Sequence, residues 1–558
     1  PSSGDRTQLY PVNPQQQRYH YLDALRAFAM LLGIVFHVLF SFVEVPIWPA
    51  QDIYRSDAHY SFFQHAIHGF RMPLFFVVSG FFTTLLWRRL GAAELIRHRA
   101  KRIALPLVIG TLVMWPLLIA ASLWGDAKKR HNAASYPHPK ITEQPADLWD
   151  AAKAGNIEMI DTLLDCGNDP NKSDRFGLSP LAWAALFGQA DAAVALLDGG
   201  AEMSARDPNG STPLHAAALL SRTSVAQCLI DRGAAINAVN HWGETPLDRS
   251  HTPLLVLATI TGLIQMEIDS REVSEGREEI RALLSASDAK SGSDLTPDEK
   301  LRQGGSGWGK LFKIYVMGAV FPVFHHLWFL YYLCCMLGLF LCATWLRRKL
   351  PSVLPVRLLA TPICLIYLIP LTFLPQLYFW QGFGANTAPG IMLWPPKFFY
   401  YAIFFCFGAA CFGKQQFEQD AGRHWILWSV AALAVLLVGL KAYYAGFHVL
   451  ASACSATYAW LMVFSCLGLF RRLFSTENSI IRYIADSSYW LYIVHFPLVI
   501  ALQIAISDWP LPSPVKLILI TAVSITLPLI SYHYCVRYTV IGRVLNGERR
   551  RPNFVGSA

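Results

Sequence analysis

The sequence predicts an all-α protein, a polytopic membrane bundle of about ten transmembrane helices interrupted by a water-soluble α-solenoid domain. Apolar residues make up 54% of the 558 residues and charged residues only 15%, whereas a soluble protein carries roughly 25% charged residues. The apolar residues form two blocks, 19–125 and 307–540, which flank a polar stretch with a 33-residue period. The expected domains are membrane block 1 (1–125), the repeat insert (126–270), a linker (271–306) and membrane block 2 (307–558).

Ten apolar segments reach or approach the length of about 20 residues that a helix needs to cross a bilayer. Groups of Lys and Arg follow the second, fourth, eighth and tenth segments, and all of them fall on the same side as the N-terminus. Because cytoplasmic loops are enriched in positive residues, we expect both termini in the cytoplasm. The insert follows the third segment, so we expect it on the other side. The segments lie at 22–43, 66–87, 103–124, 326–346, 356–374, 398–413, 425–443, 450–470, 488–506 and 515–537.

Charge and cysteine content exclude several other kinds of protein. The net charge of +9 does not indicate a nucleic-acid partner, because the basic residues collect at the ends of apolar segments, as in membrane proteins. Nine of the 11 cysteines lie in apolar segments, where cysteine behaves as a small hydrophobic residue. The other two, Cys166 and Cys228, lie two repeats apart, too far for a disulfide, whose Cα atoms must lie within about 7 Å. The cysteines show no spacing of metal ligands, and we expect no metal.

The insert contains a regular sequence repeat. Gly177, Gly210 and Gly243 are 33 residues apart, and Pro-Leu pairs follow the same period. The run Thr-Pro-Leu-His-Ala after Ser211 is similar to the motif of ankyrin repeats, which have this length. Roughly three and a half repeats cover 146–250, each a turn and two short helices that stack on the next.

Trp149, Trp183 and His215 occupy positions that are expected in the core of the repeats. The apolar segment 251–265 is too short to span a membrane, so it either covers the last repeat or rests on the membrane. The repeats carry no catalytic combination of residues. We therefore expect them to bind a protein, a glycan or the outer rim of the membrane bundle.

Two ionisable residues lie within the first apolar segment. Arg26 and His37 are separated by ten uncharged residues, so they share one helix face and lie about 16.5 Å apart along the axis. An ionisable residue inside a membrane span is costly and usually functional, and two on one face have no packing explanation. Asp23, three residues before Arg26, can pair with it. We expect a polar path that enters the bilayer from the cytoplasmic side.

Other candidate residues lie at the ends of the spans or within them. His68 and Arg71 are one turn apart at the start of the second segment, and Arg99 and Arg102 are one turn apart before the third. Each candidate also has a structural alternative. Arg99 and Arg102 could set the membrane topology, and His326 and Trp328 could anchor a helix at the membrane interface. His495 could be a packing histidine, and Ser79-Gly could mark close contact between helices. The remaining candidates are Ser79, His326, Trp328, Tyr492 and His495.

These motifs resemble those of the membrane-bound acyltransferase-3 family. Within that family, the runs that begin at Tyr21, His68 and His326 are most similar to members that succinylate osmoregulated periplasmic glucans. The resemblance covers both membrane blocks, about two thirds of the chain, and it does not cover the repeat insert. It implies a multi-pass protein of the bacterial inner membrane, surrounded by lipid, with a periplasmic insert. The motifs that carry it are Arg26-x10-His37, Arg99-x-x-Arg102, Phe75-Phe-Val-Val-Ser-Gly-Phe and Ser488-Tyr-Trp-Leu-Tyr-Ile-Val-His.

The resemblance implies an enzyme that transfers an acyl group from cytoplasmic acyl-CoA to a hydroxyl group of a periplasmic glucan. Succinyl-CoA is the favoured donor and acetyl-CoA the next. Arg99 and Arg102 would bind the CoA phosphates, since guanidinium groups suit phosphate. His37 would act as general base.

Three further roles follow in this interpretation. Arg26 would orient the substrate chain, or stabilise an oxyanion or an acyl carboxylate. Arg71 would contact the acceptor or a succinyl carboxylate. Direct transfer to the acceptor is preferred, and a covalent intermediate on Ser79 is the alternative.

Other functions are compatible with parts of the sequence. One is a transporter or flippase of acyl or glycan species, and another is an O-acetyltransferase of a different surface polysaccharide. A membrane-tethered ankyrin scaffold is a third, but it does not explain Arg26 and His37. A palmitoyltransferase is excluded because the sequence has no Asp-His-His-Cys run, and a potassium channel because it has no Thr-Val-Gly-Tyr-Gly filter.

Overall fold

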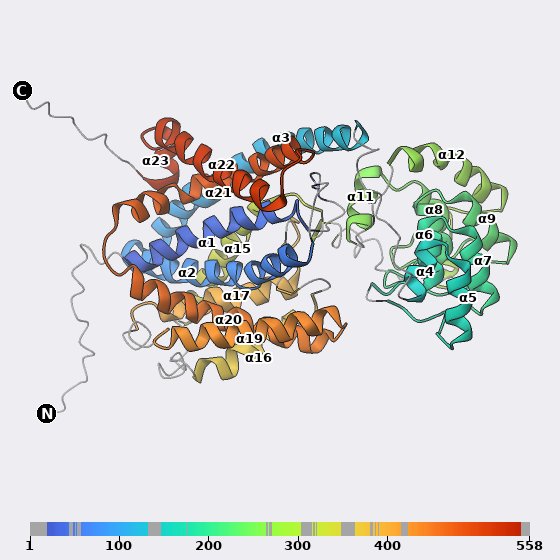
Figure 1. The fold of residues 1–558 in the computed structure, drawn as a ribbon, viewed down its shortest axis with the longest axis horizontal. Coiled ribbons are helices and arrows are strands. Elements are labelled where there is room, and N and C mark those ends of the chain that lie inside the picture. Colours follow the sequence, from blue (N-terminus) through green and yellow to red (C-terminus); the bar gives the residue numbers. More distant parts are fainter. Residues whose placement is uncertain are drawn as a thin grey trace, which may run out of the picture.

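Helices form every regular element in the described part of the chain, as the sequence predicts for an all-α protein. In this computed structural model they form two bodies, a bundle of long helices and a stack of short ones (Figure 1). The described residues are 19–43, 48, 50, 52, 57–131, 147–174, 176–263, 266, 270–302, 315, 318–319, 321–347, 363–379, 383–384, 387–388, 390–414 and 422–547.

The bundle has one helix at each of the ten predicted segments. Seven helical runs of the described chain are long and apolar enough to cross a membrane, and one run, His59–Gly125, contains two of the helices. Residues 356–362 of the fifth predicted segment lie outside the described residues. The ten helices are α1 (His20–Leu39), α2 (Asp57–Arg99), α3 (Leu105–His131), α15 (Trp328–Arg347), α16 (Ile363–Gln376), α17 (Pro395–Cys411), α19 (Trp425–Tyr444), α20 (His448–Leu473), α21 (Ser479–Ile506) and α22 (Ser513–Ser531).

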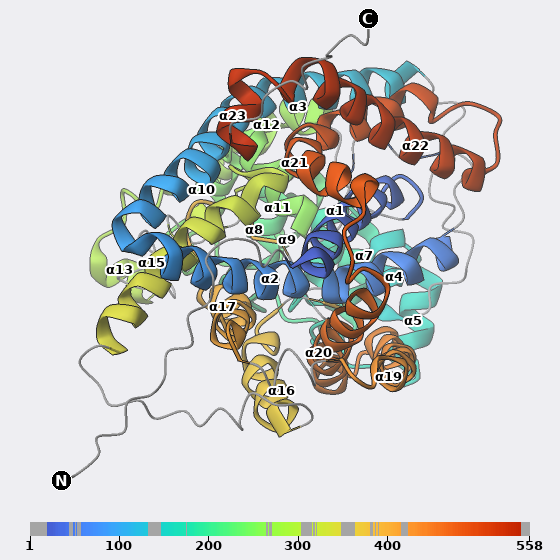
Figure 2. The ribbon, with the colours of Figure 1, turned by 90° about the vertical axis from the view of Figure 1, so that its left-hand side faces the viewer.

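Helix α1 is buried inside the bundle. It packs against α2, α20, α21 and α22, and Figure 2 shows these helices around it. Its apolar residues are buried on several faces, for example Leu25, Ile34 and Val38, as expected of a helix surrounded by protein. Helices α3, α16, α19 and α22, in contrast, carry rows of exposed aliphatic side chains suited to lipid contact. The helix that carries Arg26 and His37 is thus mostly shielded from lipid.

Helix α2 is longer than its predicted segment and bends near its end. Gly91 has φ +77°, a left-handed conformation that a residue with a Cβ rarely adopts. The first part of α2 crosses α17 closely. A Cβ on Gly80 would lie 2.0 Å from the carbonyl oxygen of Phe405, and one on Gly408 would lie 1.9 Å from that of Val77. The Ser-Gly run in α2 therefore serves close helix packing, as small residues often do in membranes.

Short irregular helices join some of the long ones. A π-helix, η1 (Ala100–Ala104), links α2 to α3; such wide turns are rare and often occur at functional sites. A 3₁₀ turn, η2 (His325–Leu327), precedes α15. The chain leaves α22 through a second π-helix, η4 (Tyr532–Val536), and a short helix, α23 (Val540–Asn546).

The insert is a stack of helix pairs beyond the end of the bundle at which α3 ends, opposite to α23 (Figure 1). Neighbouring inner helices α4, α6, α8 and α10 contact each other, as do outer helices α5, α7 and α9. Proline begins α6, α8 and α10, where its missing N–H has no cost. The bounds are α4 (Leu148–Ala154), α5 (Ile157–Asp165), α6 (Pro180–Phe187), α7 (Ala190–Asp198), α8 (Pro213–Leu219), α9 (Thr223–Asp231) and α10 (Pro246–Ser250).

The prediction of a linker at 271–306 is wrong for its first half. A helix, α12 (Ser270–Ala286), packs against α9 and α10, and it buries Val273, Ile280 and Leu284 in the core of the repeats. These residues form one apolar stripe on a helix that is otherwise highly charged. A short helix, α13 (Pro297–Arg302), follows.

The apolar segment after the last repeat covers the stack. Helix α11 (Leu254–Leu263) places Leu257 in the same buried core as α12. Trp183 and His215 are buried in the repeats, and Trp149 packs against their core. Cys166 and Cys228 are free thiols, in agreement with the spacing argument.

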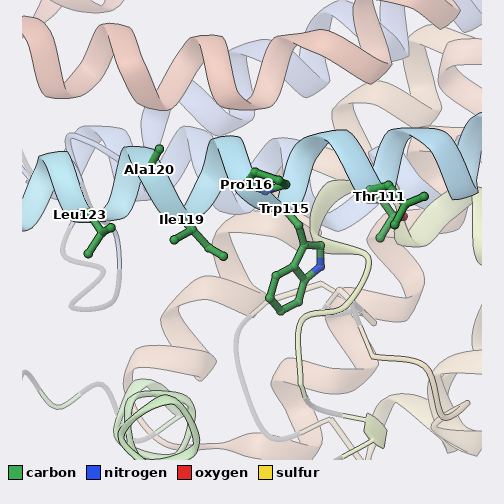
Figure 3. Close-up of a pocket in the computed structure, with 7 residues that line it drawn as sticks. Thr111, Trp115, Pro116, Ile119, Ala120 and Leu123 are labelled. Carbon is green, nitrogen blue, oxygen red and sulfur yellow. The ribbon is translucent and has the colours of Figure 1, made fainter.

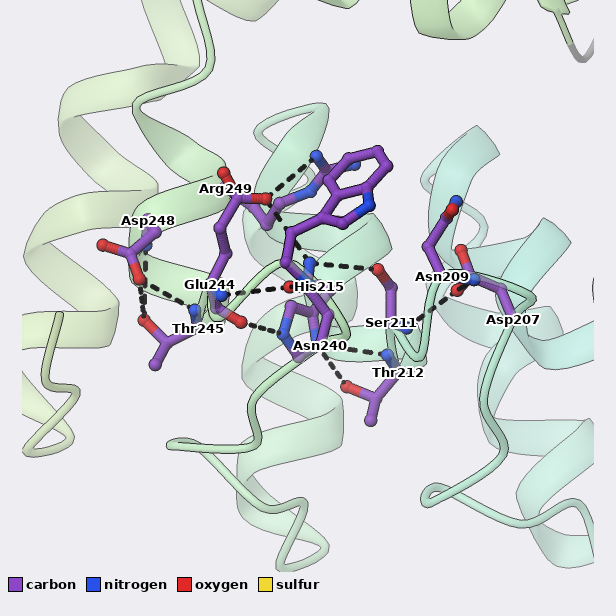
Figure 4. Close-up of polar contacts among 11 residues, drawn as sticks. Asp207, Asn209, Ser211, Thr212, His215, Asn240, Glu244, Thr245, Asp248 and Arg249 are labelled. Carbon is purple, nitrogen blue, oxygen red and sulfur yellow. Dashed lines mark hydrogen bonds and ion pairs between the residues drawn. The ribbon is translucent and has the colours of Figure 1, made fainter. Parts of the chain in front are cut away.

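A polar network joins the third repeat to the fourth (Figure 4). The backbone N–H of Thr212 donates to Nδ1 of His215 at 3.1 Å, and Nε2 of the same ring lies 3.0 Å from the carbonyl oxygen of Glu244. Because N–H groups only donate and carbonyl groups only accept, the ring is neutral with its proton on Nε2. Burial lowers the pKa of His215 to about 3.

The repeats should lose stability in mild acid. An unfolded chain binds a proton at His215 below pH about 6.5, whereas the folded chain does not, so stability falls as the pH falls from 6.5 towards 3. Between pH 7.5 and pH 5 the loss amounts to about 2 kcal/mol. Hydrogen–deuterium exchange of α8 in the full-length protein, corrected for intrinsic exchange rates, should show weaker protection at pH 5.

The control is His215→Gln, whose amide can both accept from Thr212 and donate to Glu244 without titrating in this range. Its protection should depend less on pH than that of the wild type. Equal protection of wild-type α8 at the two pH values would contradict the assignment of a neutral ring.

Candidate functional site

Two histidines from distant parts of the chain meet between α1 and α21. Nδ1 of His37 lies 3.0 Å from Nε2 of His495. The other ring nitrogen of His495, Nδ1, lies 2.9 and 3.0 Å from the carbonyl oxygens of Tyr492 and Leu491. Carbonyl oxygens only accept hydrogen bonds, so this Nδ1 carries a proton. His495 is only 1% exposed, whereas His37, in the last turn of α1, is partly exposed.

These contacts determine where the proton sits on each neutral ring. With its proton on Nδ1, the ring of His495 presents a lone pair at Nε2, so the shared hydrogen bond is donated by Nδ1–H of His37. Nε2 of His37 then carries a lone pair. His37, the more accessible ring, therefore presents a proton acceptor. The buried ring of His495 fixes the tautomer of His37, as a second residue does for the base in catalytic triads.

A third histidine, His326 in η2, packs against this pair. Nε2 of His326 lies 3.2 Å from the carbonyl oxygen of Ile493, and the hydroxyl of Tyr492 donates to the carbonyl oxygen of His326. The ring of His326 stacks on Phe496 and meets the ring of His495 edge-on at 5.3 Å. The sequence-predicted residues His326, Tyr492 and His495 thus belong to one cluster.

Phe36, the neighbour of His37, connects this cluster to α2. The ring of His68 stacks on Phe36 at 5.3 Å, and Cζ of Arg71 lies 4.4 Å from the centre of the same ring. Arg71 is 5% exposed. A Cβ on Gly33 would lie 3.1 Å from Nη1 of Arg71, so the glycine makes room for the guanidinium.

Arg26 lies three turns before His37 on α1, near the opposite end of the bundle. Its Nη2 donates to the carbonyl oxygen of Ala485 at 3.0 Å and lies 3.6 Å from Oδ1 of Asp23. The side chain of Arg26 is 40% exposed. The helix rise places Arg26 and His37 about 16.5 Å apart along α1. The two residues therefore lie at different ends of the site.

Arg99 and Arg102 gather at the Arg26 end. Nη2 of Arg99 donates to the hydroxyl oxygen of Thr83 at 3.0 Å, and the hydroxyl of Tyr489 donates to the carbonyl oxygen of Arg102 at 2.5 Å. The positive charges of the three arginines act on one another. Within the described chain, neither Arg99 nor Arg102 has a carboxylate partner. The cluster therefore carries an excess of positive charge, which suits a phosphate ligand.

Two candidates from the sequence lie elsewhere. Ser79 follows Arg71 by eight residues, about 12 Å along α2, and its carbonyl oxygen accepts from the hydroxyl of Thr83. Trp328 is buried among the aromatic rings of Phe76, Tyr332 and Tyr401. In the described structure, neither makes a hydrogen bond or ring contact with the three histidines.

Comparison with known proteins identifies the family to which the membrane bundle belongs. A family model described as an acyltransferase domain matches residues 19–145 and 293–533, most of the chain outside the insert. The chain belongs to acyltransferase family 3. A model for three copies of ankyrin repeats matches residues 148–240. The repeats therefore interrupt the acyltransferase domain between α3 and α15.

Curated relatives match a shorter region. Glucans biosynthesis protein C of Escherichia coli K12 (DH10B) is 35% identical over 98 residues, which cover 17% of this chain and 25% of the relative. The same protein from E. coli SMS-3-5 is 36% identical over 98 residues, with the same shares of each chain. The chain thus spans about a quarter of the length of the curated relatives it matches.

Sequence reasoning missed a buried amide that holds this candidate site together. Nε2 of Gln503 donates to the carbonyl oxygens of His37 and Val38 at 3.1 and 2.9 Å, and its Oε1 accepts from the indole N–H of Trp48 at 3.0 Å. The amide thus satisfies backbone carbonyls at the end of α1, which lack partners within their helix. A polar residue eight positions after His495, inside an apolar segment, was the available signal.

Two lysines fix the end of α21 in this acyltransferase. Nζ of Lys128, near the end of α3, donates to the carbonyl oxygens of Ile504 and Ala505 and to the carboxylate of Asp508. Nζ of Lys516 donates to Oδ2 of Asp52 at 2.6 Å and to the carbonyl oxygen of Ser507 at 3.0 Å. Cations at a helix C-terminus are stabilising.

A hollow of about 740 Å³ along α3 lies outside this site (Figure 3). None of the candidate residues lines it, and its mostly apolar walls suit contact with lipid. Among the described residues, no group of three His, Cys, Asp or Glu side chains could hold a metal ion. The residues that line the hollow are Thr111, Leu112, Trp115, Pro116, Ile119, Ala120 and Leu123.

Proposed function

We propose that this acyltransferase moves an acyl group from cytoplasmic acyl-CoA to a hydroxyl group of a glucan on the other side of the membrane. The observation that carries the proposal is the hydrogen bond between His37 and His495, which leaves a lone pair on Nε2 of His37. A base fixed in one tautomer is what hydroxyl activation requires. No observation favours a transporter over an enzyme of this family.

The reaction is a direct transfer. Nε2 of His37 takes the proton of the acceptor hydroxyl while its oxygen attacks the carbonyl carbon of the thioester. The carbon–sulfur bond then breaks, and the protonated His37 returns the proton to the departing thiolate of CoA. The products are an ester of the glucan and free CoA. His495 keeps the tautomer of His37 through these steps and does not exchange protons with the substrates.

The arginine cluster is the proposed binding site of the CoA phosphates. Arg26, Arg99 and Arg102 lie at one end of the bundle. Among the described residues, only Arg26 of the three forms an ion pair with a carboxylate, that of Asp23, so the three guanidinium groups favour a polyanion. The pantetheine arm of CoA would then run along α1 towards His37. The distance between Arg26 and His37, about 16.5 Å along the helix, supports this path because it requires a long arm between the phosphates and the thioester.

The acceptor and the topology are proposed on independent grounds. The relatives are named glucans biosynthesis protein C, which supports a glucan acceptor. For the acyl group we propose succinyl, with acetyl as the next. The basic loops support an inner-membrane protein with cytoplasmic termini. The start of α1 and α23 lie at the end of the bundle opposite to the insert (Figure 1), so the repeats would lie in the periplasm and bind a protein or a glycan there.

Purified protein in detergent should release CoA and acylate glucan when it is given both substrates. His37→Ala should lower turnover by about 10²- to 10⁴-fold, the contribution of a general base. His495→Gln retains an oxygen that can accept from Nδ1–H of His37, so it should keep more activity than His495→Leu. Measurements of free thiol and of glucan mass would follow both products. Full activity of His37→Ala, or equal activities of the two His495 variants, would contradict the assigned roles.

Removal of charge from the arginine cluster should weaken donor binding. Arg99→Gln and Arg102→Gln should each raise the KM for acyl-CoA by about ten-fold, the effect of one lost charge-assisted hydrogen bond, with a smaller change in the KM for glucan. Arg97→Gln is the matched control, because Arg97 is exposed and paired with Glu94. A donor KM that changes equally in all three variants would assign these arginines to membrane topology instead.

Cys166 offers a test of the topology without any substitution, because it is the exposed cysteine of the described insert. In cells with a permeabilised outer membrane, a membrane-impermeant thiol reagent should modify the peptide that contains Cys166, as mass spectrometry would detect. Cys166→Ser is the control for that peptide. If Cys166 reacts only after the inner membrane is opened, the insert is cytoplasmic.

A further inference from the structure

His326 has a buried ring nitrogen that no group of the described chain satisfies. Its Nε2 lies 3.2 Å from the carbonyl oxygen of Ile493, and a carbonyl oxygen only accepts, so Nε2 carries the proton of the neutral ring. Nδ1 then has a lone pair and can only accept a hydrogen bond. Within the described chain this Nδ1 is buried without a partner, and the residue is only 7% exposed.

The fully buried histidine of the same cluster, in contrast, uses both of its ring nitrogens. Nδ1 of His495 donates to two backbone carbonyl oxygens, and its Nε2 accepts from Nδ1 of His37. A buried polar atom without a partner costs free energy, and most buried polar atoms in proteins are therefore satisfied. Nδ1 of His326 points to a hydrogen-bond donor that arrives with a ligand.

The structure around His326 holds its ring in place. The hydroxyl of Tyr492 donates to the carbonyl oxygen of His326, and a Cβ on Gly110 of α3 would lie 2.9 Å from Cδ1 of Leu327, so η2 is packed tightly against α3. His325 has φ +42°, a left-handed conformation that costs free energy for a residue with a Cβ and that clusters at functional sites. A ring held in this way cannot satisfy Nδ1 by turning towards solvent.

The position of His326 determines which part of the substrates can supply the missing donor. The ring of His326 stacks on Phe496 at 4.7 Å, and the ring of His37 meets Phe496 edge-on at 4.9 Å, so both histidines contact the same aromatic ring. The arginines proposed for the CoA phosphates lie about three helical turns away along α1. The donor must therefore belong to a group next to the base, where the acceptor hydroxyl has to lie for His37 to take its proton.

We propose, building on the acyl transfer proposed above, that Nδ1 of His326 accepts a hydrogen bond from a second hydroxyl group of the acceptor sugar. A sugar ring carries hydroxyl groups on neighbouring carbons, so it can present one to His37 and the next to His326. The contact fixes which hydroxyl faces the base, and the enzyme selects acceptors that have both groups. The amide groups of pantetheine are less suitable donors, because in the proposed reaction this arm lies on the arginine side of the thioester.

Glucose oligosaccharides that lack single hydroxyl groups test this contact with the full-length protein in detergent. For the wild type, removal of one hydroxyl next to the acylated position should lower kcat/KM by about ten- to hundred-fold, because Nδ1 of His326 is left unsatisfied. Removal of a more distant hydroxyl should have a smaller effect, and NMR of the product would identify the acylated position. If every analogue that keeps the acylated hydroxyl reacts like the parent sugar, the proposal is overturned.

His326→Leu should remove this discrimination. It should lower kcat/KM for the parent sugar by about ten-fold and leave little difference between the parent and the sensitive analogue. His326→Asn has an amide oxygen that can accept in place of Nδ1, so it should retain part of the difference. A full difference in His326→Leu would overturn the proposal, and so would a loss of about 10²- to 10⁴-fold with every acceptor, which would make His326 a second base.

Unchanged affinity for acyl-CoA would show that both variants are folded, because the arginine cluster lies at the other end of the site. If His326→Leu does not fold, the wild type and His326→Asn decide the outcome: a wild type that discriminates by ten-fold or more, with a smaller difference in His326→Asn, supports the contact. Equal discrimination by these two proteins contradicts it.

A binding measurement separates this proposal from the proposed function. In the absence of acyl-CoA, wild-type protein should bind the parent oligosaccharide more tightly than one of its monodeoxy analogues, and His326→Leu should bind the two equally. This result would support the hydroxyl site even if no acyl transfer were found, which would contradict only the proposed reaction. Equal affinities of the wild type for the parent and all analogues would overturn the role of His326, whatever the transfer assay gives.

Discussion

The hydrogen bond between His37 and His495 is the contact on which the rest of the site depends. It joins α1 to α21 across most of the sequence, so it forms only if both helices keep their position and rotation. Gln503 holds the end of α1 on α21, and the pair of Lys516 and Asp52 holds the end of α21 beside the loop after α1. Such support matters because a base must be placed within tenths of an ångström to act.

The site has two ends with different electrostatics. The end with Arg26, Arg99 and Arg102 carries an excess of positive charge and is partly exposed, whereas the end with His37 has neutral rings, aromatic walls and one buried guanidinium. Helix α1 contributes to both. This division suits a donor whose charged nucleotide and reactive thioester are far apart, since each part finds a matching environment.

Sequence periodicity predicted the helices, the repeats and one face of α1, because these depend on residues close together in the chain. The contact of His37 with His495 could not be predicted in this way, since it depends on how α1 packs against α21. The linker prediction was wrong for α12 because Val273, Ile280 and Leu284 are hidden among charged residues, and only their fit to the repeat core explains them. The proton positions on His37 and His495 required the carbonyl contacts of His495.

Helix α3 precedes the insert in the chain, and Lys128 near its end caps the helix that carries His495. Lys128 therefore links α3, the last described helix before the insert, to the helix that carries His495. Thermodynamic linkage works in both directions along such a connection. If a ligand of the repeats favoured one position of α3, it would alter the affinity of the site for its substrates, and a ligand of the site would alter the affinity of the repeats by the same factor.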